Sequence, residues 1–166
     1  MNYTALIIAC LMMLAFIAVI KMIINKNVQQ QALDNGKTAK GIVLPLRLQA
    51  YERMALFLER IEPNQLVMRI HSTGLNVGQE QNLLLTSIRS EFEHNLSQQI
   101  YISNEVWKCV CDAKDDIIDI INAVAAQYEP TADSLEFAQA LLAAAAEKPV
   151  VEKAMLILKA DVQRLF

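Results

Sequence analysis

The sequence has few residues that interrupt regular structure, with only four glycines and four prolines among 166 residues. Most of them stand where a hydrophobic pattern begins or ends, which is typical of helix boundaries. A Gly-rich phosphate loop, a Ser-centred nucleophile elbow and a Cys-x-x-Cys pair are all missing. We therefore expect an all-α protein that is not an enzyme and that uses no cofactor.

Cysteine is also scarce, and the sequence contains only Cys10, Cys109 and Cys111. An odd number of cysteines does not make a disulfide framework, and this agrees with a reducing cytoplasm. Cys109 and Cys111 would point about 200° apart on a helix, so they cannot hold one metal ion together. We interpret both as small apolar side chains.

Charge is missing from the first stretch, Met1–Ile20, and the apolar run continues beyond Lys21 to Ile24. About 20 helical residues span about 30 Å, the hydrocarbon thickness of a bilayer, so this stretch predicts a single transmembrane helix. A cleaved signal peptide would have a positive n-region and a small-x-small site before Lys21, and both are missing. A lipoprotein signal at Ile7–Cys10 would have only about six apolar residues before its cysteine, which is too few.

The charges that flank this stretch predict its orientation. No charged side chain precedes it, whereas five basic residues and only one acidic residue follow closely: Lys21, Lys26, Lys37, Lys40 and Arg47, against Asp34. The positive-inside rule places the N-terminus outside and the rest of the chain in the cytoplasm, at the inner membrane of a bacterium. Lys21 and Lys26 would contact the headgroups of the lipid bilayer.

Net charge differs between the two parts of the chain. Residues 1–51 carry five basic and one acidic side chain, whereas residues 52–166 carry ten basic and seventeen acidic ones. An acidic surface does not follow a phosphate backbone, so we expect no nucleic acid partner. The acidic part suits ordinary solubility or a basic protein partner.

The hydrophobic pattern divides the chain into three parts. Residues 1–33 form the anchor and its helical extension, residues 34–43 with Gly36 and Gly41 form a linker, and residues 44–166 form a helical cytoplasmic domain. The expected fold is therefore an N-terminal transmembrane helix followed by a compact bundle of about five helices.

Several boundaries and faces within the domain can be predicted. Pro45 should open a helix, and Ser103 and Asp133 are expected to be N-caps. One helix is expected over residues 78–102, because apolar side chains recur there every four residues: Leu84, Ile88, Phe92, Leu96 and Ile100. Residues 64–73 fit either a strand or a short helix, and we favour a helix closed by Gly74.

Two stretches resemble a known family: LPLRLQAYERMALFLERIEPNQLVMRIH (Leu44–His71) and EFEHNLSQQIYIS (Glu91–Ser103). They are similar to an uncharacterised family of small single-pass membrane proteins from Bacteroidota, a domain of unknown function. The resemblance covers most of the chain, from the anchor to at least Trp107. It implies an all-α domain behind one transmembrane helix, and it assigns no activity, cofactor or catalytic residue.

Glu91 and His94 form a Glu-x-x-His pair, which di-iron helical bundles use as a metal-binding motif. Such a site needs two of these motifs and two further inward carboxylates, whereas this sequence has one motif. Phe92 and Leu96 mark the predicted buried face, which leaves His94 on the polar side. We interpret Glu91, Glu93 and His94 as a solvated patch and a weak docking surface, with a metal site as the alternative.

Four aspartates follow a helical spacing of i, i+3, i+4 and i+7: Asp112, Asp115, Asp116 and Asp119. They form one acidic stripe opposite the predicted buried face of the helix over residues 104–128. Like charges at this spacing cost about 0.2–0.5 kcal/mol per pair, and Lys108 can offset part of this cost. The stripe is either a solvated face, a docking surface for a basic partner or a weak site for divalent ions, and it lacks the loop of an EF-hand.

These features predict a membrane-anchored helical accessory or adaptor protein, a non-catalytic component of a cell-envelope assembly. Docking is expected at the acidic stripe. One alternative is a membrane-bound metal-binding protein or enzyme that uses Glu91 and His94. Another is a self-associating structural membrane protein, a homo-oligomer that makes contact through Ala143–Ala146 or through the anchor.

Overall fold

The computed structural model describes the backbone of residues 3–166 and every side chain from residue 41 onward. Before residue 41 it describes nine exposed side chains: Met12, Met13, Phe16, Ile20, Lys21, Met22, Ile24, Asn25 and Lys26. Residues 3–166 form six α-helices and one 3-10 helix and contain no strand, which confirms the all-α class.

The described residues contain no helix that is both long enough and apolar enough to cross a membrane. Most side chains of the predicted anchor, Met1–Ile24, lie outside the described residues. Lys21 and Lys26, which were expected to contact the lipid headgroups, are both exposed.

Helix α1 spans Tyr3–Ile61 without interruption, so the helix break predicted at residues 34–43 was wrong. A glycine inside a helix costs only about 1 kcal/mol relative to alanine, and helix-favouring neighbours can outweigh Gly36 and Gly41. Pro45 likewise lies inside α1 instead of opening a helix. Its missing N–H removes one backbone hydrogen bond, to the carbonyl of Gly41. The chain forms two compact units that are divided at this proline, Met1–Leu44 and Pro45–Phe166.

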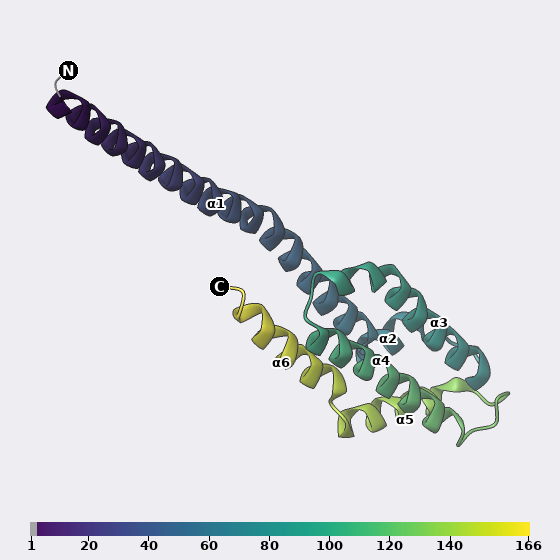
Figure 1. Cartoon of the computed structure of the whole chain (residues 1–166). Coiled ribbons are helices and arrows are strands. Elements are labelled where there is room, and N and C mark those ends of the chain that lie inside the picture. Colours follow the sequence, from purple (N-terminus) through teal and green to yellow (C-terminus); the bar gives the residue numbers. More distant parts are fainter. Residues whose placement is uncertain (1–2) are drawn as a thin grey trace. The chain divides into compact units, whose positions relative to one another are not determined.

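The second unit contains the end of α1 and all later helices (Figure 1). These are α2 (Pro63–Ile70), α3 (Val77–Asn95), the 3-10 helix η1 (Leu96–Ile100), α4 (Asn104–Ala125), α5 (Ser134–Glu147) and α6 (Val150–Gln163). The ambiguous residues 64–73 thus include a helix, as favoured, although it ends at Ile70 and not at Gly74. Gly74 instead takes the turn after α2, where its φ of 93° suits a residue without a Cβ.

Side-chain caps explain where several of these helices begin. Asn76 and Gln79 form a reciprocal capping box at the start of α3. The hydroxyl of Ser103 accepts a hydrogen bond from the backbone N–H of Val106 at 3.3 Å, which begins α4. Asp133 accepts one from the N–H of Leu135 at 2.9 Å, which begins α5. The structure thus confirms Ser103 and Asp133 as N-caps.

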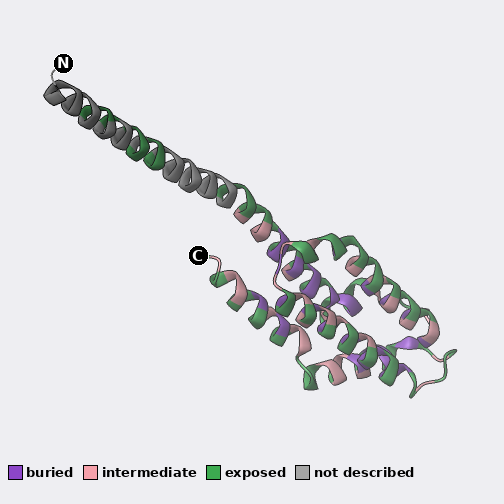
Figure 2. Cartoon of the chain, viewed as in Figure 1, coloured by how far each residue is buried: buried purple, intermediate pink, exposed green. Residues whose placement is uncertain are grey.

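Helix α4 is the centre of the core, because it packs against α3, α5 and α6. Its buried face follows the helical period and contains Val106, Val110, Ala113, Ile117, Ile120, Ile121, Val124 and Ala125. In Figure 2 the buried positions of the second unit lie along one side of the α-helices, while the opposite sides are exposed. The 3-10 helix η1 has no buried residue.

The buried stripe predicted over residues 78–102 ends earlier than expected. Leu84 and Ile88 are fully buried, but Leu96 is 39% exposed and Ile100 is 73% exposed. Helix α3 ends at Asn95, whose side-chain amide donates to the carbonyl of Glu91 at 2.7 Å. The chain continues as a 3-10 helix with about three residues per turn, so a four-residue period no longer keeps side chains on one face.

Leu83 and Leu84 are neighbours in α3 with opposite surroundings, because Leu83 is 47% exposed and Leu84 is fully buried. Leu84→Ala would leave a cavity in the core, and we expect it to lower the free energy of unfolding by about 2–5 kcal/mol. Leu83→Ala is the matched control and should change it by no more than about 0.5 kcal/mol. Urea unfolding followed by circular dichroism measures both, and equal losses would contradict this assignment of the buried face.

Candidate functional site

A groove of about 540 Å³ lies between the last part of α1 and the end of α3. One wall comes from α1 and contains Gln49, Glu52, Arg53, Leu56, Phe57 and Arg60. The other wall comes from α3 and contains Ser90, Glu91, His94 and Asn95. The groove therefore brings Glu91 and His94, which the sequence singled out, beside two arginines that it did not.

An aromatic cluster begins at Phe57, which lines this groove. Phe57 of α1 is buried, and its ring centroid lies 5.8 Å from that of Phe92 in α3. Phe92 stacks on Trp107 of α4 with centroids 5.4 Å apart, and the Nζ of Lys114 lies 5.0 Å from the Phe92 ring centroid. Aromatic and cation–π contacts of this kind stabilise by about 0.5–1.5 kcal/mol each, so they help to hold α1, α3 and α4 together.

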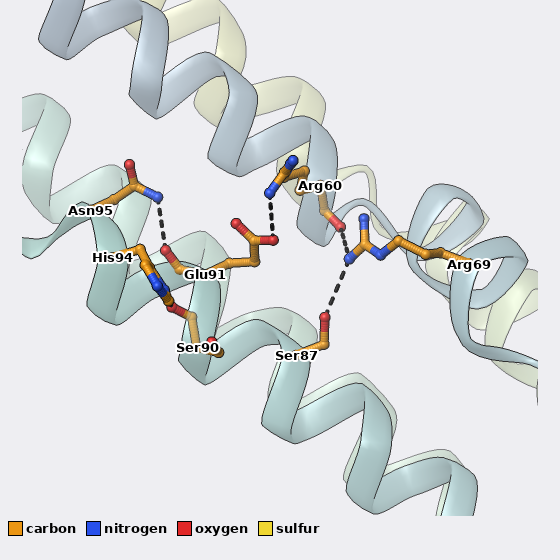
Figure 3. A network of polar contacts seen from close by, with 7 residues as sticks. All are labelled: Arg60, Arg69, Ser87, Ser90, Glu91, His94 and Asn95. Atoms are coloured by element: carbon orange, nitrogen blue, oxygen red, sulfur yellow. Dashed lines mark hydrogen bonds and ion pairs between the residues drawn. The ribbon is translucent and has the colours of Figure 1, made fainter.

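Polar contacts at the surface join α1, α2 and α3 (Figure 3). The Nη1 of Arg60 lies 2.6 Å from the Oε1 of Glu91 and links α1 to α3. Arg69 of α2 donates from Nη2 to the carbonyl of Arg60 at 3.3 Å and to the hydroxyl of Ser87 at 3.2 Å. The groove thus has a basic edge on α1 that is partly neutralised by Glu91.

The Glu-x-x-His pair is not arranged as a metal site. The carboxylate of Glu91 faces Arg60, and the Nδ1–H of His94 donates to the carbonyl of Ser90 in its own helix at 2.6 Å (Figure 3). Within the described part of the chain, no three His, Cys, Asp or Glu side chains gather closely enough to hold a metal ion. Glu93 is exposed and does not line the groove, so the structure does not bring it together with Glu91 and His94.

The acidic stripe lies on the exposed side of α4, opposite its buried face. The Nζ of Lys108 lies 2.5 Å from the Oδ2 of Asp112, and Lys114 pairs with Asp115. Asp116 and Asp119 form no ion pair with any side chain that the structure describes. The stripe therefore presents two carboxylates whose charge is not neutralised by a neighbour.

Cys109 and Cys111 are both half-buried. Burial raises the pKa of both thiols, and the charge of Asp112 adds to the rise at Cys109. A raised pKa lowers the fraction of thiolate at neutral pH, so neither cysteine is an activated nucleophile. This agrees with their interpretation as small apolar side chains.

Asp161 of α6 accepts hydrogen bonds from two other helical segments, an arrangement that we call the Asp161 clasp. The hydroxyl of Tyr51 donates to its Oδ2 at 2.5 Å, and the hydroxyl of Ser103 donates to the same oxygen at 2.7 Å. Burial alone raises the pKa of Asp161, but these two hydrogen bonds, together with Arg164 and Arg47, outweigh it and hold the pKa below the usual value. The clasp joins α6 to α1 and to the N-cap of α4.

Glu80 is a fully buried carboxylate in the first turn of α3. The Nδ1–H of His71 donates to its Oε2 at 2.9 Å and lies 3.2 Å from its Oε1. The side chain of His71 is 28% exposed. The pair joins the end of α2 to the start of α3.

Residues 1–165 match the model of a family of unknown function, DUF7935. The chain belongs to this family. No curated protein and no solved structure matches it. Membership in DUF7935 agrees with the resemblance to an uncharacterised domain, and it assigns no role to any residue.

The polar contacts that join the helices of this DUF7935 domain were not predicted from the sequence. A signal was nevertheless present, because Asp161 stands beside Leu158 and Val162 on the inward face of α6. Glu80 likewise lies on the face of α3 that buries Val77 and Leu84. A charged residue on a predicted buried face indicates a paired polar contact, but the identity of its partner depends on the tertiary structure.

Asp161→Asn keeps the size of the side chain and removes the charge that Tyr51 and Ser103 stabilise. We expect a loss of about 1–2 kcal/mol in the free energy of unfolding at pH 7. Because the folded-state pKa is lowered, this stabilisation is present above the ordinary pKa of aspartate and is lost as the pH falls through the lowered value. The difference between wild type and variant should therefore shrink below about pH 4.

Urea unfolding at pH 7, 5 and 3 measures this difference, with Lys159→Gln on the exposed side of the same helix as the control. The control should behave like the wild type at all three values. A difference for Asp161→Asn that is as large at pH 3 as at pH 7 would show that the charge of Asp161 contributes nothing.

The two histidines of the DUF7935 chain differ in their surroundings, so their alanine variants can be compared directly. His71→Ala leaves the buried carboxylate of Glu80 without its partner, and we expect a loss of about 2–3 kcal/mol in the free energy of unfolding. This is below the 3–5 kcal/mol typical of a dry ion pair, because His71 is partly exposed. His94→Ala removes an exposed ring and should change the free energy of unfolding by less than about 0.5 kcal/mol. Thermal unfolding of both variants tests this, and a His71 variant as stable as the His94 variant would contradict it.

Proposed function

We propose that this protein is a non-catalytic, membrane-anchored adaptor that captures a basic region of a protein partner on the acidic stripe of α4. The apolar N-terminal stretch holds the helical domain at the cytoplasmic side of a bacterial inner membrane, as part of a cell-envelope assembly. The resemblance to Bacteroidota membrane proteins supports this setting.

The anchor rests on the sequence of Met1–Ile20, which has no charged side chain. The basic residues that follow it support the orientation, with Lys21 and Lys26 at the headgroups of the inner leaflet. Confining the domain to a surface raises its local concentration for a partner in the same membrane, so a weak docking contact can be effective.

A single observation carries the docking proposal: Asp116 and Asp119 are exposed on the same side of α4 and have no described ion-pair partner. Like charges at this spacing disfavour the isolated helix, so the stripe does not stabilise the fold. A row of carboxylates instead attracts a basic partner from a distance and orients it. The contacts of Glu91 with Arg60 and of His94 with Ser90 favour this adaptor over the metal-binding alternative.

The test is Asp116→Lys together with Asp119→Lys in the full chain. These changes break no described ion pair, and each new lysine stands four residues after an aspartate, Asp112 or Asp115, an arrangement that favours the helix. The chain is purified from native membranes in mild detergent, and the proteins that co-elute are quantified by mass spectrometry. We expect the specific partners of the wild type to fall at least about tenfold in the variant, and added salt to weaken the wild-type complex.

The matched control is Glu129→Lys together with Glu147→Lys, which changes the net charge equally at exposed positions away from α4. This control should retain the partners. If the two variants lose the same proteins, or if neither loses any, the stripe is not the docking surface.

A further inference from the structure

The exposed face of α1 in the second unit carries an ordered charge pattern that the proposed function does not use. We call it the α1 seam, and it consists of Gln49, Glu52, Arg53, Leu56, Glu59 and Arg60, all of them exposed. At about 100° per residue, Gln49 and Leu56 lie near the midline of this face. Glu52 and Glu59 fall on one side of the midline, and Arg53 and Arg60 fall on the other side.

The seam repeats every seven residues, since Gln49 is followed by Leu56, Glu52 by Glu59, and Arg53 by Arg60. A seven-residue repeat keeps one face of a helix aligned with a second helix, and charges that flank such a face set partner choice and orientation. Leu56 at its centre is 50% exposed and stands between four charged residues, so an apolar contact is available at the midline of the seam.

The seam coincides with one wall of the groove. Five of its six residues line the groove, and Glu59 is the exception. The basic edge faces α3, because Arg60 pairs with Glu91 there at 2.6 Å. The acidic edge, Glu52 and Glu59, lies on the other side of the midline. A helix laid along the seam would therefore meet a concave surface whose α1 wall contains both arginines.

We propose that the α1 seam binds the same seam of a second copy of this chain, with the two helices parallel and in register. A twofold axis along the pair places the acidic edge of each helix against the basic edge of the other. Glu52 then faces Arg53 of the second copy, Glu59 faces Arg60 of the second copy, and the two Leu56 side chains meet at the centre. Each acidic edge enters the groove of the other copy.

The charge pattern selects this orientation over the antiparallel one. In an antiparallel pair the basic edge of one helix lies beside the basic edge of the other, and the two acidic edges also meet, so like charges oppose each other along both sides. In a parallel pair both helices also run in the same direction, which is compatible with two anchors in one membrane. The self-association does not depend on the acidic stripe, because α4 takes no part in the seam.

Cysteine cross-linking in the full chain tests the orientation, after Cys10, Cys109 and Cys111 have been replaced by serine. Under mild oxidation of the protein in detergent micelles, the parallel pair predicts disulfide-linked dimers for both Leu56→Cys and Gln49→Cys. An antiparallel pair centred on Leu56 would cross-link Leu56→Cys only. Gln139→Cys, at an exposed position of α5, is the control. Cross-linking of Gln49→Cys that does not exceed this control would overturn the proposal.

Complementary charge reversal tests the specific contacts. Glu52 and Arg53 have no ion pair among the described residues, so reversing either one breaks no described ion pair of the monomer. Glu52→Arg and Arg53→Glu each place two like-charged contacts in a homodimer, and each should weaken self-association by about tenfold or more in sedimentation velocity. An equal mixture of the two variants restores opposite charges at both contacts and should recover the dimer.

The chain carrying both reversals should also associate with itself, because positions 52 and 53 have exchanged signs together and still face each other as opposite charges. Circular dichroism of each variant checks that the helical fold is retained. The proposal fails if the mixture associates no better than the separate variants, or if the wild type stays monomeric at the highest concentration reached. Neither result decides whether a single α4 stripe binds a basic partner, so the two proposals are tested separately.

Discussion

Burial of one face of α4 is the constraint on which the rest of the domain depends. Helices α3, α5 and α6 all pack against this face, and each contributes side chains to the same core. The hydrophobic effect stabilises the folded state by about 25 cal/mol for each Å² of apolar surface that this burial removes from water. Because a single helix has only one face to bury in this way, its opposite face remains in solvent, and in α4 that face carries the acidic stripe.

Polar contacts give this hydrophobic core a defined arrangement. The Asp161 clasp joins Tyr51 to a residue 110 positions later in the chain, and it also contacts the N-cap of α4. Glu80 and His71 join α2 to α3 at the other end of α3 from the groove. Apolar contacts alone tolerate sliding between helices, whereas a buried carboxylate is stable only where its donors are in place. The register of α6 and of α3 is therefore tied to single side chains.

The two surfaces with an unexplained charge pattern are on different helices. We propose that the acidic stripe of α4 binds a basic partner and that the α1 seam binds a second copy of the chain. Combined in one protein, the two would present two acidic stripes in one assembly. Two linked weak sites bind a partner that carries two basic regions far more tightly than one site does, provided that both regions can be reached together. Self-association through α1 would in this way strengthen docking through α4.

The sequence by itself determined the helical class, the N-caps at Ser103 and Asp133, the buried face of α4 and the exposed positions of His94 and the four aspartates. These features follow from local hydrogen bonding and from helical periodicity, which neighbouring residues specify without distant contacts.

Other features were decided only by the tertiary structure. The continuity of α1 through Gly36, Gly41 and Pro45 was one of them, and so was the exposure of Leu96 and Ile100 after the change to a 3-10 helix. The partners of Asp161, Glu80 and Glu91 also belong to this group, because each lies on another helix. A local pattern shows which face of a helix is apolar, but only the packing of whole helices brings a given donor to a given carboxylate.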